Sequence, residues 1–139
     1  MVVSDTRRMI AEMAPVLSEV RYVFSETRDE RVVERTLPHA FAIVREDEAI
    51  TLVLPIAEAS KLGIDRADLA HFARITLTVH SALEGVGLTA AVSTELARSG
   101  IACNVIAASR HDHIFVPATQ AEEAMLALKA LSKGEPRVV

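Results

Sequence analysis

The order of hydrophobic patterns in the second half of the chain limits its fold more than any other sequence feature. Phe72 to Val79 alternates apolar and polar residues, which predicts a half-buried strand. Val86 to Ser99 then repeats apolar residues at helical spacing, with Gly100 as a stop signal. Two short strands are expected next, at Ile101–Ala108 and His113–Val116. A capping box at Thr119–Glu122 then predicts a helix that ends at about Ser132. The order β-α-β-β-α lacks only the last strand of a ferredoxin-like unit, whose antiparallel sheet carries two helices on one face.

The first half shows comparable but weaker patterns. A helix is predicted from about Asp5 to Ala14 and a strand at Arg21–Ser25, while the charged run Glu26–Glu34 is expected to be a solvated loop. A β-hairpin around an acidic turn and a short helix follow, at Ala40–Arg45, Ala49–Leu54 and Ile56–Leu62. The Arg21–Ser25 strand is available as the strand that the second half lacks. We therefore expect an α+β protein of two ferredoxin-like (βαββαβ) subdomains, residues 1–68 and 69–139, with antiparallel sheets and helices packed on them.

Composition excludes several classes of function. The chain has 139 residues, 15 Lys and Arg against 19 Asp and Glu, and a net charge of −4, so it lacks the basic excess of a nucleic-acid binder. A single Cys allows neither an internal disulfide nor a cysteine-based zinc site. No apolar run approaches the roughly 18–20 residues of a membrane helix, and the first residues lack a signal-peptide pattern. We expect a cytoplasmic protein with no cofactor and no nucleic-acid or membrane partner.

Two stretches of the second half resemble the ACT domain family: His80 to Val92, with the sequence HSALEGVGLTAAV, and Gly100 to Val105, with the sequence GIACNV. The segment His111–Pro117 looks more specifically like the small bacterial two-subdomain ACT-domain proteins of unknown function. Those proteins join a divergent ACT-like N-terminal half to a more standard C-terminal half. The resemblance covers most of the chain, from about Met9 to Leu131.

The resemblance implies a small regulatory module that binds an amino acid or related metabolite at a subdomain or dimer interface, without catalysis. The family's ligand lies between the loop after the first ACT strand and the second strand of a neighbouring unit. Carried over by position, this implies a ligand site formed by His80, Ser81, Val86, Gly87, Leu88 and Asn104. Val86 stands where the family commonly has a proline. A homodimer is the implied assembly.

The residue chemistry agrees with such a ligand but also allows a structural role. A glycine at a helix start lets a ligand approach the backbone, and the free N–H groups there favour a carboxylate. Asn104 and Glu84 could accept hydrogen bonds from the ammonium group of an amino acid. Alternatively, Gly87 only permits close helix–sheet packing, and Asn104 only satisfies backbone groups.

Two other kinds of function remain open. A protein-interaction module without a ligand would show an apolar patch at its partner site. A metal-dependent enzyme could use His111 and His113, which share a strand face. His80 is not expected to join them. Strands 72–79 and 113–116 are expected to run parallel, which places His80 and His111 about 16 Å apart. Cys103 alternates with apolar residues and is expected to be a buried structural thiol.

Overall fold

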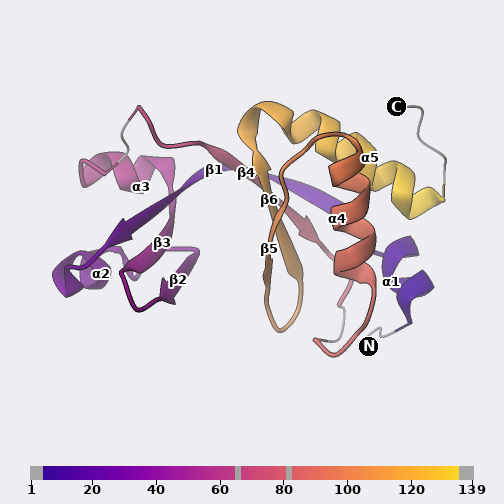
Figure 1. Ribbon diagram of the computed structural model, residues 1–139, viewed down its shortest axis with the longest axis horizontal. Coiled ribbons are helices and arrows are strands. Elements are labelled where there is room, and N and C mark those ends of the chain that lie inside the picture. The colour runs from indigo at the N-terminus through magenta and orange to yellow at the C-terminus, as the bar shows by residue number, and fades with distance from the viewer. Residues whose placement is uncertain (1–4, 65–66, 81–82, 135–139) are drawn as a thin grey trace. The chain divides into compact units, whose positions relative to one another are not determined.

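The computed structural model describes residues 5–64, 67–80 and 83–134 (Figure 1). The chain divides into two compact units. One consists of Val20–Phe72 and is called the central unit here; the other joins the residues up to Glu19 to those from Ala73 onward and is called the terminal unit. The sequence-based division at residue 68 stays a prediction.

The terminal unit has the expected ferredoxin-like order. Its elements are α1 (Thr6–Ala11), the start of β1 (Pro15–Thr27), β4 (Phe72–Leu77), α4 (Leu88–Arg98), β5 (Asn104–Ala107), β6 (Asp112–Pro117), a short 3₁₀ helix (Ala118–Gln120) and α5 (Ala121–Lys133). The strands lie in the order β1-β4-β6-β5. The Thr78 N–H and hydroxyl donate to the carbonyls of Met13 and Ala14, at 2.6 and 2.8 Å, so the chain entering β1 lies beside the end of β4. β1 thus supplies the strand that the second half lacks.

Alternation decides which side chains of the terminal unit are buried. Ala73, Ile75 and Leu77 of β4 are buried, as the sequence pattern predicts. They pack with Val92 and Leu96 of α4 in one hydrophobic core. α4 and α5 lie side by side over this sheet, as Figure 1 shows.

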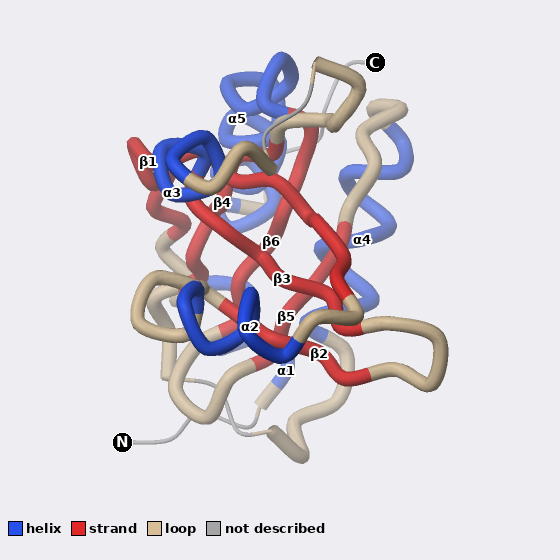
Figure 2. Tube along the Cα trace, turned by 90° about the vertical axis from the view of Figure 1, so that its left-hand side faces the viewer, coloured by secondary structure: helices blue, strands red, loops and turns tan. Residues whose placement is uncertain are grey.

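The central unit repeats the order on a smaller scale. It contains the rest of β1, α2 (Glu30–Thr36), β2 (Ala42–Arg45), β3 (Ile50–Pro55) and α3 (Ile56–Lys61). Its strands lie in the order β2-β3-β1, and both pairs are antiparallel. Figure 2 shows α2 and α3 on the near side of these strands. Val23, Leu52 and Leu54 form the core with Val33 of α2 and Ala59 of α3.

The predicted hairpin is confirmed, but the predicted loop at Glu26–Glu34 is wrong. β2 and β3 pair across the acidic turn, which the Glu46 N–H closes on the Ala49 carbonyl at 3.0 Å. The charged run instead extends β1 to Thr27 and then begins α2. The run misleads because α2 is so short that it buries only Val33 and Thr36, while its charged residues lie outside.

The helix ends also differ in part from expectation. Gly134 ends α5 with a φ of 70°, as a C-terminal glycine should. The predicted capping box is wrong, because Thr119 lies inside the 3₁₀ turn and no side chain caps α5 at Gln120. β1 begins at Pro15, six residues before the expected strand. Residues 15–20 read poorly as a strand because Val16, Glu19 and Val20 are exposed.

Candidate ligand site

The start of α4 is built around Gly87. This residue precedes the helix with a φ of +108°, and its carbonyl accepts a hydrogen bond from the Ala91 N–H at 2.9 Å. A Cβ atom at Gly87 would lie 2.8 Å from Cγ2 of Thr6. The Thr6 hydroxyl donates to the Val86 carbonyl, which holds α1 against this turn. Glycine is therefore required at position 87 by the backbone conformation and by the close approach of α1. The sequence suggested close packing of a helix on the sheet here, whereas the close neighbour is another helix, α1.

A small cavity lies beside this helix start. Its volume is about 70 Å³. It is lined by Met9, Leu83, Gly85, Leu88, Thr89, Ala107 and Asp112. Ligand pockets usually measure about 300–1,000 Å³, so this cavity does not enclose a metabolite by itself. Leu88, one of the predicted ligand residues, is 3% exposed and belongs to the core.

Asn104 does not lie with the other predicted residues. It is exposed at the beginning of β5 and pairs with Phe115, whereas Ala107 at the other end of β5 lines the cavity. Asn104 and Ala107 are three residue steps apart along β5, a distance of about 10 Å. Within one copy of the chain, Asn104 and the start of α4 therefore lie toward opposite ends of β5.

The remaining predicted residues flank the turn. His80 is half-buried, three residues after the end of β4, and Ser81 lies outside the described residues. Val86 is 79% exposed and Leu83 is 67% exposed. Two large apolar side chains thus project from the loop that begins α4.

The histidines lie closer together than the sequence argument allowed. The His111 Nδ1 atom lies 3.3 Å from the Val79 carbonyl oxygen, and His113 Nδ1 lies 2.9 Å from the Thr76 hydroxyl. Going forward along β4 means going backward along β6, so these strands run antiparallel. The expected parallel arrangement, and with it the separation of about 16 Å, is wrong. A carbonyl only accepts hydrogen bonds, so His111 Nδ1 carries the proton.

Two side chains of the terminal unit, His113 and Cys103, have pKa values shifted by their surroundings. Burial, with the charges of Arg74 and His111, holds the pKa of His113 below its usual value of 6.5. Burial raises the pKa of the Cys103 thiol, whose side chain packs against the core of the terminal unit. Across residues 5–64, 67–80 and 83–134, no three His, Cys, Asp or Glu side chains are arranged to hold a metal ion.

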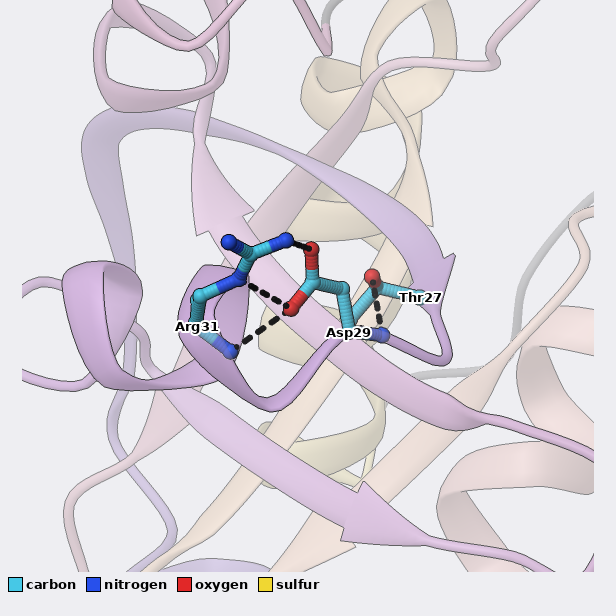
Figure 3. A network of polar contacts seen from close by, with 3 residues as sticks. All are labelled: Thr27, Asp29 and Arg31. Carbon is cyan, nitrogen blue, oxygen red and sulfur yellow. Dashed lines mark hydrogen bonds and ion pairs between the residues drawn. The ribbon is translucent and has the colours of Figure 1, made fainter.

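Sequence reasoning missed the start of α2 in the central unit (Figure 3). Asp29 caps this helix by accepting a hydrogen bond from the Arg31 N–H at 2.9 Å. The Arg31 guanidinium lies 3.3 Å from the same carboxylate, and the Thr27 hydroxyl accepts from the Asp29 N–H at 3.1 Å. These bonds, the backbone one foremost, lower the pKa of Asp29 below 3.8. The T-x-D-x-R spacing was the available signal, because Asp at an N-cap is common.

Comparison with known proteins assigns the family. Family models for the ACT domain match residues 3–71 and 73–130. No curated protein matches the chain. None of the helices among the described residues has the length and apolarity needed to cross a membrane.

Solved structures agree with this match. A protein of unknown function from Vibrio cholerae, described as a possible transport protein, is 42% identical, with 88% of this chain and 92% of that chain covered and a TM-score of 0.77. The aspartokinase alpha and beta subunits are 11% identical over 86% of this chain and 97% of that chain, with a TM-score of 0.63. The regulatory subunit of aspartate kinase from Thermus flavus is 10% identical over 84% and 95%, with a TM-score of 0.59. The chain belongs to the ACT domain family, with one ACT match in each half.

Proposed function

We propose that this chain is a non-catalytic, cytoplasmic regulatory module that binds an amino acid or a related metabolite between two copies of itself. Membership of the ACT family over both halves supports a regulatory role. The fold is shared with a structure described as the regulatory subunit of aspartate kinase. One observation carries the proposal. Asn104 lies at the end of β5 away from the start of α4, so a second copy would have to bring an Asn104 to a ligand bound there.

The α4 start supplies the place for a carboxylate. Gly87 has no side chain with which to cap the helix, and the first N–H groups of a helix have no partner within it. These donors and the positive end of the helix dipole favour a negative group. The exposed loop at Leu83 and Val86 leaves room for a ligand to approach from solvent.

A second copy would supply the missing side chain. β5 is the last strand of the terminal unit's sheet, and it pairs with β6 on one side. If two β5 strands paired antiparallel about their centre, Asn104 of one copy would lie opposite Ala107 of the other. Ala107 lines the cavity beside Leu88, so the partner's Asn104 would reach the α4 start and accept from the ligand's ammonium.

Thermal melting against the standard amino acids tests this proposal. A ligand at 100 times its dissociation constant adds about 2.7 kcal/mol, which is a rise of several degrees for a chain of this size. The Asn104→Ala variant should lose that rise, as should Val86→Asp, which places a carboxylate at the helix start. Thr94→Ala, an exposed change on α4, is the matched control and should keep it. Sedimentation should show a dimer, and the fraction of dimer should change in Asn104→Ala or when the ligand is added.

A ligand-free interaction module is the second candidate, favoured by the exposed Leu83 and Val86. It predicts no melting shift with any amino acid. It also predicts that Val86→Asp weakens self-association and makes the melting temperature less dependent on protein concentration. A flat amino-acid panel with a stable dimer would therefore replace the sensing proposal with this one.

A further inference from the structure

The central unit contains a cavity that the proposed function does not use. Its volume is about 730 Å³. It is lined by Phe24, Ser25, Glu26, Thr51, Gly63, Ile64 and Leu69. All of these residues belong to the central unit, and the volume lies within the range of about 300–1,000 Å³ typical of small-molecule sites.

The walls of this cavity are held by the fold of the central unit. Glu26 and Thr51 are partners in the pairing of β1 with β3, and Phe24 lies two residues earlier on β1. The Phe24 ring is packed edge-on against Phe72, with ring centroids 5.2 Å apart. Ile64 and Leu69 pack against the core of the unit, and the Ile64 N–H donates to the Ala59 carbonyl at 2.9 Å. The apolar side of the cavity is therefore anchored rather than loose.

The polar side of the cavity accepts hydrogen bonds and carries negative charge. The Thr51 hydroxyl donates to the Glu46 carboxylate at 3.1 Å, so its proton is already used and its oxygen presents lone pairs. Among the described residues, the Glu26 carboxylate has no ion pair or hydrogen bond, and its side chain is exposed. A ligand that fits must donate hydrogen bonds and carry positive charge.

We propose that this cavity binds an organic ammonium ion, a primary amine with a branched apolar chain and no carboxylate. The ammonium group lies between Glu26 and Thr51, and the apolar chain lies against Ile64, Leu69 and the Phe24 ring. A carboxylate on the ligand would meet Glu26 and the nearby Glu46, so a free amine binds better than the corresponding amino acid. This site is separate from the α4 start and does not depend on the function proposed there.

The experiment titrates the ¹⁵N-labelled full chain with 3-methylbutylamine at pH 7 and follows the backbone amide shifts. Shifts should concentrate at Ser25, Thr51, Ile64 and Leu69. Leucine, which carries the same chain with a carboxylate, and 3-methylbutanol, which carries no charge, should each bind several-fold more weakly. Equal binding of the amine and the alcohol would overturn the proposal, and so would shifts that map elsewhere.

Variants that each remove one negative charge distinguish binding of the amine in the cavity from a general attraction of the cation to an acidic protein. Glu26→Gln should weaken binding of the amine about two- to five-fold, as expected for an exposed ion pair. Glu34→Gln removes the same charge from an exposed position on α2 outside the cavity and should leave binding unchanged. Thr51→Val, which keeps the β-branched shape, should also weaken binding. Equal affinity of Glu26→Gln and Glu34→Gln would overturn the assignment.

Discussion

The connections from β1 to α2 and from β4 to α4 begin their helices in opposite ways. In the central unit, β1 leads into α2 through Asp29, whose carboxylate already occupies the first-turn N–H of Arg31. In the terminal unit, β4 leads into α4 through Gly87, which has no side chain and a positive φ. The same strand-to-helix connection is thus capped by the protein's own carboxylate in one unit and carries a glycine without a capping side chain in the other. A shared fold does not give the two units the same chemistry at this connection.

The largest effect is expected from Gly87→Val. The new side chain must adopt a φ near +108° and displace Thr6 Cγ2, which would lie 2.8 Å from its Cβ. We expect a loss of about 2–4 kcal/mol in the free energy of unfolding, measured with urea. This substitution therefore cannot serve as a pure test of ligand binding.

Gly100→Ala provides the matched control for the smaller substitution Gly87→Ala. Gly100 has a φ of +69° in the same unit, but nothing lies within 4 Å of an added Cβ. It should lose only about 1–2 kcal/mol for the left-handed backbone. In Gly87→Ala, adding Thr6→Ser should recover part of the loss, because serine keeps the hydroxyl and lacks Cγ2. Equal losses for Gly87→Ala and Gly100→Ala would show that contact with Thr6 contributes nothing.

The next largest effect is expected from Asp29→Ala, which should destabilise α2 to an extent that depends on pH. The pKa of Asp29 is lowered below 3.8 in the folded chain, so its contribution is complete above the unfolded pKa and is lost as pH falls through the folded value. Hydrogen exchange of the α2 amides should be faster in Asp29→Ala than in the wild type at pH 6. The two proteins should converge at the lowest pH. Hydrogen exchange of the α4 amides should not change. An equal change there would contradict the prediction that Asp29 stabilises only the helix of its own unit.

The elements that sequence predicted are those whose pattern is set by local burial. The alternation of β4 appears directly in the buried Ala73, Ile75 and Leu77, and the hairpin around residues 46–48 follows from its two apolar strands. α2 was missed because a short helix buries too few side chains to leave a period. The first residues of β1 were missed because several of their side chains are exposed.

The details of the sites depend on contacts that no local pattern encodes. Thr6, which decides what Gly87 tolerates, is 80 residues from Val86 in sequence. The antiparallel direction of β4 and β6, which overturned the argument about the histidines, is shown by the contacts of Thr76 with His113 and of Val79 with His111. The cavity of the central unit joins β1, β3 and the segment after α3, so it exists only once these elements are packed.

A smaller, pH-dependent effect should distinguish the terminal unit. The pKa of His113 is lowered by burial and by Arg74 and His111, so the folded chain binds this proton more weakly than the unfolded chain. The cost of binding this proton therefore appears as pH falls below about 6.5, and stability should rise as pH increases from the lowered pKa of the folded chain to about 6.5. His113→Gln should flatten this part of the urea midpoint–pH curve. An unchanged slope in His113→Gln would remove His113 as the cause.

The smallest effect is expected from Thr27→Val, which tests how far the start of α2 depends on its surroundings. Valine keeps the β-branched shape that suits the end of β1 but cannot accept the Asp29 N–H bond of 3.1 Å. This exposed bond should contribute about 0.5–1 kcal/mol, measured by urea unfolding. Thr27 contacts the backbone of Asp29, whereas the cap is made by the carboxylate, so the double variant with Asp29→Ala should show nearly additive losses. Strong coupling would mean that Thr27 and Asp29 form one unit of structure, and that the central unit closes its helix start with a network rather than with a single carboxylate.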